Sequence, residues 1–144
     1  MKSSVILYAD LTEDRRILLT GDAGLQALSW AAAYARANSY LLQRFSFVKI
    51  PHHGSRRNVG PAILNEILGP IQPEGTVRFT AFVSAPKDDE THPRQIVLNA
   101  FVRRGGKVIA TQGTNKIHYG GFPKRNGYVD VEPIPFSTKV EEYD

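Results

Sequence analysis

Three side chains that bind metal ions well follow two apolar segments of this sequence. Asp22 lies in the turn GDAG after the run 17–20, and His52 and His53 lie in the segment PHHGS after the run 45–50. The ends of neighbouring strands in one sheet lie close together, so a carboxylate and an imidazole at two such turns can meet. The chain has no cysteine, which leaves His, Asp and Glu as its strong metal ligands. The pattern therefore predicts a metal site.

Each of these residues also has a structural interpretation. An aspartate before a helix commonly caps it by accepting hydrogen bonds from backbone N–H groups, so Asp22 alone indicates a helix start equally well. Of two adjacent histidines, one can bind a metal while the other contacts substrate or supports the first. His92 precedes Pro93, where a helix is expected to begin, and a loop histidine in that position is commonly structural. His118 has no supporting neighbours and is not assigned to the site.

Alternating strand-like and helical segments are expected to position these residues. β-rich apolar runs predict strands at 5–8, 17–20, 45–50, 77–84, 108–111 and 128–131. Helical spacing of apolar residues predicts helices over 25–37, 63–68 and 93–101. The first two strands are expected to form an antiparallel hairpin with a longer loop over 10–16. This order predicts an α/β domain whose chemistry lies in the loops after strands.

Composition is typical of one globular domain of 144 residues, with 42% hydrophobic and 22% charged residues. We expect this domain to span 1–132, with 133–144 forming a polar tail or an edge segment. No apolar run reaches the length of a membrane span, and the first residues do not resemble a signal peptide, so we expect a cytoplasmic protein. Lys and Arg number 18 against 14 Asp and Glu, which favours an anionic partner such as nucleic acid or a phosphoester, or is an ordinary basic surface.

Two motifs resemble a known family. The segments LLTGDAG (18–24) and VKIPHHGS (48–55) are similar to the late motifs of metallo-β-lactamase-fold hydrolases, in particular the hydrolase domain of the DNA-uptake protein ComEC and its soluble relatives. The segments SVIL (4–7) and THP (91–93) also resemble that subgroup, so the resemblance covers about 4–111. It implies the C-terminal half of an αββα sandwich, with a mixed sheet and helices on one of its faces.

The resemblance also implies roles for single residues. Asp22 corresponds to the carboxylate that bridges two metal ions, zinc or manganese, and His53, or less favourably His52, to a ligand of the second ion. His52, Ser55 and His92 are then candidates for catalytic or substrate contacts. Contacts to phosphate or nucleic acid are expected from Lys49, Arg56 and Arg57. The implied function is that of a metal-dependent phosphodiesterase or nuclease-like hydrolase.

The family's first metal motif, a His-x-His-x-Asp-His loop, does not occur in the chain, nor does the single histidine expected after it. A catalytic site needs about three protein ligands per ion, so we expect the isolated chain to bind metal weakly or to be inactive. A missing N-terminal half, a second polypeptide with that loop, or a second copy of the chain would cover the other sheet face. The alternative is a non-catalytic module that binds nucleic acid or protein.

Overall fold

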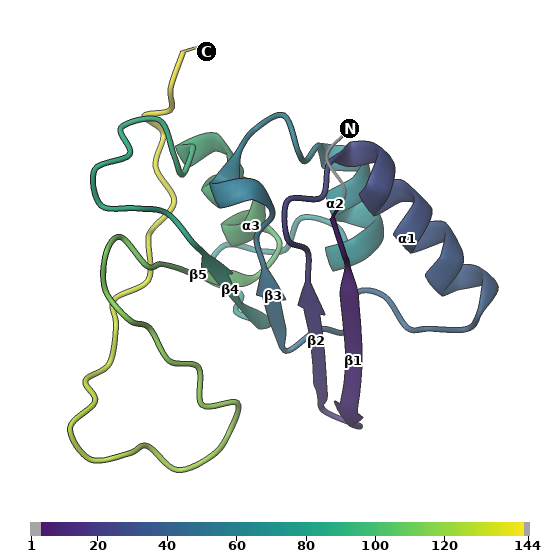
Figure 1. Ribbon diagram of the computed structural model, residues 1–144, viewed down its shortest axis with the longest axis horizontal. Helices are drawn as coiled ribbons and strands as arrows, with labels where there is room; N and C mark the ends of the chain where they lie inside the picture. Colours follow the sequence, from purple (N-terminus) through teal and green to yellow (C-terminus); the bar gives the residue numbers. More distant parts are fainter. Residues whose placement is uncertain (1–3, 143–144) are drawn as a thin grey trace.

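The computed structural model describes residues 4–142, and these form an α/β fold with a five-stranded mixed sheet and three helices (Figure 1). The strands are β1 (Leu7–Thr12), β2 (Arg15–Leu19), β3 (Phe47–Lys49), β4 (Phe79–Val83) and β5 (Gly106–Ala110). The helices are α1 (Leu25–Ala37), α2 (Pro61–Leu68) and α3 (Gln95–Arg103), and a short 3₁₀ turn, η1, covers His52–Gly54. The predicted α/β class and mixed sheet are confirmed.

The strands lie in sequence order across the sheet. β1 pairs with β2 in antiparallel fashion, and β2, β3, β4 and β5 are parallel to one another. Parallel neighbours need crossover connections, which α1, α2 and α3 provide. The carboxyl ends of β2, β3 and β4 therefore open into loops on one edge of the sheet. This edge carries Asp22, the two adjacent histidines and His92.

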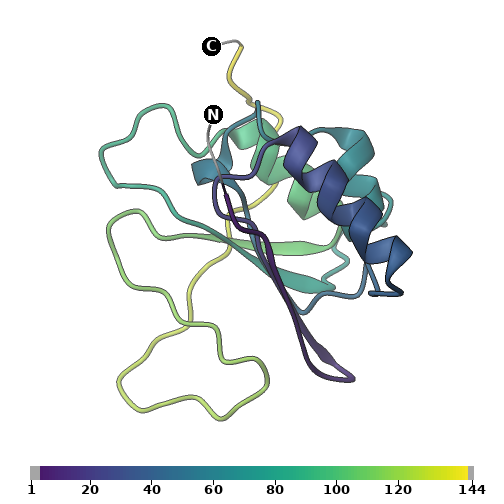
Figure 2. The same ribbon diagram turned by 45° about the vertical axis from the view of Figure 1, so that its right-hand side comes forward.

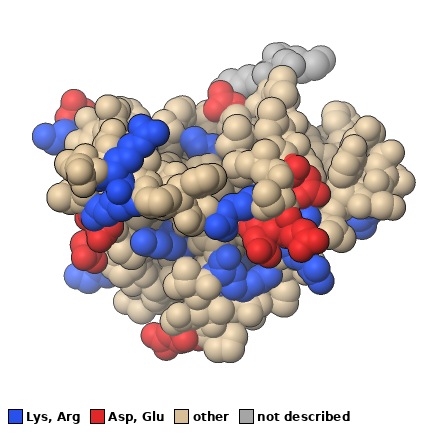
Figure 3. Space-filling model, turned by 90° about the horizontal axis from the view of Figure 1, so that it is seen from below, with Lys and Arg blue, Asp and Glu red and all other residues tan. Residues whose placement is uncertain are grey.

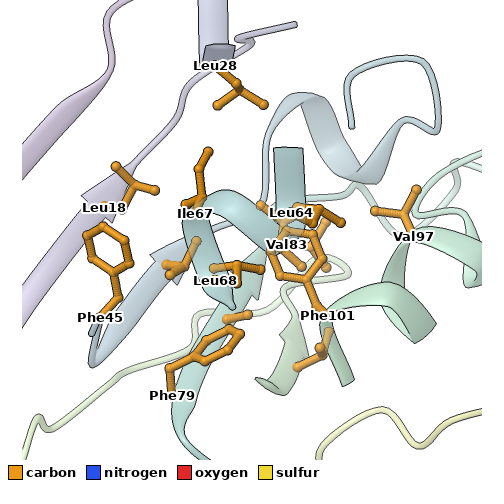
Figure 4. Packing of buried hydrophobic residues seen from close by; sticks show 14 of the residues in the cluster. Leu18, Leu28, Phe45, Leu64, Ile67, Leu68, Phe79, Val83, Val97 and Phe101 are labelled. Carbon is orange, nitrogen blue, oxygen red and sulfur yellow. The ribbon is translucent and has the colours of Figure 1, made fainter. Parts of the chain in front are cut away.

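All three helices cover the same face of the sheet, as the turned view shows (Figure 2). Strand residues in one row across the sheet, including Leu18, Val48, Ala81 and Val108, are buried against them. Figure 4 shows how the side chains of sheet and helices meet in this core. Phe101 of α3 is 1% exposed and is among the largest fully buried side chains. The core thus fixes the strand ends that carry the candidate site.

The opposite face of the sheet carries apolar side chains that no helix covers. Leu7 and Leu19 are paired across β1 and β2, and their exposed fractions are 47% and 39%. The segment 112–131, on the far side of the sheet from the helices, covers part of this face (Figures 1 and 2). Its His118 ring contacts Phe47 and Phe82 at centroid distances of 5.0 and 6.4 Å. This partly open face is the one that we call the free sheet face.

Several predicted boundaries were wrong. The first hairpin turns through Glu13 and Asp14 alone instead of a longer loop, because β1 extends to Thr12. The predicted strand over 128–131 does not form, and that stretch belongs to the irregular segment over the free sheet face. α3 begins at Gln95 instead of Pro93.

The tail beyond 133 follows the body of the fold without forming a strand. Ile134 donates its N–H to the carbonyl oxygen of Val108, and the Glu141 carboxylate accepts the N–H of Gln95. These contacts attach the tail to β5 and α3. Residues 1–3 and 143–144, which belong to the expected domain start and tail, lie outside the described residues. Within residues 4–142, no helix is long and apolar enough to cross a bilayer.

Candidate functional site

Asp22 lies in the exposed loop between β2 and α1. Its N–H donates to Ser4 Oγ at 2.9 Å, and its carbonyl oxygen accepts from Asn58 Nδ2 at 3.2 Å. The N-cap of α1 is Gly24, and no side chain forms a capping hydrogen bond there. The interpretation of Asp22 as a helix cap was therefore wrong. Its backbone is held while the carboxylate remains available to solvent.

The two histidines lie in a strained turn directly after β3. His52, His53 and Gly54 have φ values of 44°, 56° and 79°, so three consecutive residues adopt the left-handed conformation. For residues other than glycine this conformation costs about 1–2 kcal/mol each. A Cβ atom on Gly54 would lie 2.8 Å from Cβ of Pro93, so the turn packs closely on the segment before α3. Strain of this kind is typical of functional sites.

Hydrogen bonds fix the histidine turn to the loop of Asp22. The His52 N–H donates to the carbonyl oxygen of Gly21 at 3.0 Å. Asn58 donates through Nδ2 to the carbonyl oxygens of Asp22 and Ala23, at 3.2 and 3.0 Å. Because both contacts require a donor, they establish which end of the Asn58 amide is Nδ2. Its Oδ1 therefore faces His52.

Both imidazoles are oriented through Nδ1. His52 Nδ1 lies 3.0 Å from Asn58 Oδ1, and His53 Nδ1 lies 2.6 Å from the carbonyl oxygen of Ser84. Each partner is an acceptor, so each neutral ring carries its proton on Nδ1 and has its lone pair on Nε2. Histidines that bind metals usually donate their other N–H to an oxygen in this way. The rings are thus prepared to present Nε2 to a ligand.

His92 lies beside these rings and has a similar orientation. Its Nδ1 lies 3.2 Å from Asp89 Oδ2, and its ring is stacked with that of His52 at a centroid distance of 6.5 Å. Asp89 Oδ1 accepts the N–H groups of Thr91 and His92 at 2.8 and 3.0 Å. These backbone bonds, that of Thr91 first, hold the pKa of Asp89 below its usual value. The contact between His92 and His52 favours a place for His92 at the site over a role elsewhere in the fold.

The predicted cationic and hydroxyl residues occupy different environments. Lys49 is half-buried, and burial lowers the pKa of its ammonium group while the Asp22 carboxylate opposes that shift. Ser55 is 7% exposed, and its Oγ accepts the N–H of Arg57 at 3.3 Å, so this hydroxyl supports the turn. Arg56 is half-buried and Arg57 is exposed, directly beyond the histidines. Lys49 thus has an electrostatic interaction with the Asp22 carboxylate.

The structure brings the histidines together and ties their turn to the loop of Asp22. The His52 and His53 ring centroids are 5.8 Å apart. Within residues 4–142, however, no three His, Asp or Glu side chains form a group that could hold a metal ion. The arrangement therefore offers oriented donors from three neighbouring loops instead of a complete ligand set.

Sequence reasoning missed two residues that orient the site. Asn58 bonds His52 and both backbone carbonyls of the Asp22 loop, and Asp89 bonds the ring and the backbone of His92. The spacing Asp-x-x-His offered a local signal for Asp89, because aspartates commonly bond backbone N–H groups two or three residues further on. Asn58 had no comparable signal.

Comparison of the chain with protein-family models, with curated proteins and with solved structures found no match.

Proposed function

We propose that this chain is the C-terminal half of a metal-dependent hydrolase of the metallo-β-lactamase fold, with a phosphoester as substrate. The observation that carries the proposal is the orientation of His52 and His53, whose Nδ1 atoms both face oxygen acceptors at the carboxyl end of β3. His52 is also bonded through its backbone N–H to the carbonyl oxygen of Gly21, which precedes Asp22. The motifs of the sequence and the mixed sheet with helices on one face support the same proposal.

The donor set suits zinc or manganese. Imidazole nitrogen and carboxylate oxygen are ligands that both ions accept in proteins. Asp22 would supply the carboxylate, and His53 or His52 the imidazole. A bound ion would supply Lewis-acid activation of a phosphoester and of water. Lys49 holds positive charge beside the carboxylate, and His92, oriented by Asp89, lies within reach of a substrate on this edge.

This set of donors is smaller than a catalytic ion requires. A catalytic zinc ion has about three protein ligands, and Asp22 with one histidine provides two. We therefore propose that the chain alone is inactive and that a partner supplies the remaining ligands. Either a polypeptide with the His-x-His-x-Asp-His loop or a second copy of this chain would fill that place.

The free sheet face supports a partner. Leu7 and Leu19 have exposed fractions of 47% and 39% there, and exposed apolar patches commonly mark interfaces. A partner that covers this face would add the second sheet that an αββα sandwich requires. Mass measurement in solution and binding of a hydrophobic dye test this point. A chain that is strictly monomeric and does not bind the dye would contradict it.

Isothermal titration with zinc or manganese tests the metal site itself. We expect saturable binding weaker than micromolar that is lost in Asp22→Ala and in the variant of the ligating histidine, His53→Ala or His52→Ala. His118→Ala is the matched control, because it removes a histidine that packs on Phe47 and Phe82, outside the loops of Asp22, His52 and His53, and should leave binding unchanged. Equal affinity in all four variants would contradict the proposal, since ions would then bind the surface non-specifically.

A second candidate function is a binding module for nucleic acid without metal. It is favoured by Arg56 and Arg57, which follow the histidine turn directly, and by the overall excess of cations. Binding of an oligonucleotide that persists in a chelator and falls steeply with salt would support this function. Binding that requires the ion would support the hydrolase.

A further inference from the structure

A second cluster of charged side chains lies at the other end of the sheet. A hollow of about 570 Å³ is lined by the tip of the β1–β2 hairpin, the starts of β3 and β4 and the segment 118–121. These are the amino ends of the parallel strands, whereas His52 and His53 lie at the carboxyl end of β3. Seen from below, this end of the molecule gathers blue Lys and Arg side chains beside a group of red acidic ones (Figure 3).

Three guanidinium groups border the hollow without a carboxylate partner. Arg15, Arg44 and Arg78 line it, and none of them forms an ion pair with Asp or Glu in the part of the chain that is described. The carboxylates of Glu13 and Asp14 also border it, but they lie on the exposed hairpin tip. The lining therefore has more arginines than carboxylates. Among residues 4–142, no ion pair neutralises the charge of these three arginines.

One of these cations is held in place. Arg78 donates through Nη1 to the carbonyl oxygen of Leu68 at 3.0 Å and through Nη2 to that of Gln43 at 2.7 Å. Carbonyl oxygens orient the guanidinium but do not cancel its charge. A fixed guanidinium loses little conformational entropy when it binds an anion.

A second, more apolar chamber of about 510 Å³ adjoins the first. The two share a wall formed by Arg15, Ser46, His118, Gly120 and Gly121. Apolar residues bordering the second chamber include Leu11, Ile17 and Phe122. A cationic chamber next to an apolar one suits a ligand with an anionic group and an apolar body.

We infer that these two chambers bind a small phosphate-bearing molecule, with its phosphate on Arg15, Arg44 and Arg78 and its apolar or aromatic body against Leu11 and Ile17. The planar guanidinium fork matches phosphate oxygens in a bidentate manner, which favours phosphate over a less charged anion. This site lies apart from His52, His53 and His92 and needs no metal. If this inference were wrong, the proposed hydrolase function would be unaffected.

His118 reports on the charge of the shared wall. Its ring lies against Phe47 and Phe82, and burial lowers its pKa, with further lowering by the cations Arg15 and Lys107. A phosphate in the first chamber would stabilise the imidazolium form. The pKa of His118, followed by NMR, should therefore rise when the ligand binds.

Calorimetric titration with inorganic pyrophosphate and with a nucleoside monophosphate, at low ionic strength, tests the inference. We expect both to bind saturably, with the nucleotide tighter because its base can occupy the apolar chamber. Arg44→Gln should weaken pyrophosphate binding about ten- to a hundredfold, since a hydrogen bond to a charged group contributes about 1.5–3 kcal/mol and each 1.4 kcal/mol is a factor of about ten. Arg103→Gln is the matched control, because it removes the same charge from the exposed end of α3, outside both chambers.

Two glycine variants distinguish a steric effect on phosphate binding from an effect of backbone strain. Gly120 and Gly121 both have positive φ, so alanine strains either position. A Cβ atom on Gly121 would collide with the Arg15 guanidinium, whereas one on Gly120 would make only ordinary contact with His118. Gly121→Ala should therefore reduce phosphate binding more than Gly120→Ala.

Three results would overturn the inference. The first is no saturable binding of either small ligand, even where a single-stranded oligonucleotide binds, since nucleic acid would then be the occupant. The second is equal weakening in Arg44→Gln and Arg103→Gln, which would show non-specific attraction. Saturable binding with an unchanged His118 pKa would place the ligand elsewhere and would also count against it.

Discussion

Replacing Asn58 should release both turns of the candidate metal site at once. Its side chain is buried and makes three hydrogen bonds, one to His52 Nδ1 and two to the carbonyl oxygens of Asp22 and Ala23. A typical hydrogen bond contributes about 1 kcal/mol to stability, so Asn58→Ala should lower the free energy of unfolding by about 3 kcal/mol. Urea unfolding measures this loss directly.

The same variant should change the chemistry of His52. Without Oδ1 of Asn58 the ring is no longer held with its proton on Nδ1, so a mixture of tautomers should replace the single one. Nitrogen-detected NMR of the imidazole distinguishes the two forms. Loss of an orienting bond to a metal-binding histidine weakens metal binding by about tenfold or more. The calorimetric affinity should therefore fall by that amount if His52 is the ligand and change little if His53, which Ser84 orients, is the ligand.

Asn58→Asp is the matched comparison. Its carboxylate can still accept from His52 Nδ1 but cannot donate to the two carbonyl oxygens. It should therefore keep the His52 tautomer while losing stability. If His52 kept its proton on Nδ1 in Asn58→Ala as well, Asn58 would not be what orients the ring, and the reasoning would be refuted.

Three further changes test other parts of the structure. Gly54→Ala should destabilise the fold by about 2–4 kcal/mol, because alanine is strained in the left-handed conformation and its Cβ would be packed too closely against Pro93. An unchanged melting temperature would contradict this close packing. Asp89 has a lowered pKa in the folded state, so its contribution to stability is present above its unfolded pKa and is lost as the pH falls through the folded pKa. Asp89→Asn should remove this acid-dependent part of the unfolding free energy. If the variant and the wild type had the same pH profile of stability, the bonds of Asp89 to Thr91 and His92 would not contribute. Phe101→Ala should cost about 3–5 kcal/mol in urea unfolding, and a small loss would mean that α3 is not part of the core.

The sequence predicted the frame of the candidate site well. Asp22 and the two histidines were expected after strands of one sheet, and the structure places them after β2 and β3, which are parallel neighbours. This succeeded because hydrophobic runs bounded by glycine and proline are local signals, and parallel strands bring their carboxyl ends to one edge.

What the sequence could not predict depends on tertiary contacts. The orientation of His52 requires Asn58, which reaches it only because η1 turns the chain back on itself. The stretch 128–131 has a strand-like pattern, but it lies in an irregular, mostly exposed segment that borders a cavity over the free sheet face, and it pairs with no strand. Local propensity predicts neither outcome, because packing partners decide both.

The central claim is that Asp22 and a histidine of the adjacent turn grip the same ion. A crystal structure of the chain grown with zinc measures this most directly, through the anomalous signal of the metal. We predict a peak at about 2.0–2.2 Å from an Asp22 carboxylate oxygen and from Nε2 of His53 or His52. Zinc bound only elsewhere, with those two side chains turned away from each other, would contradict the claim.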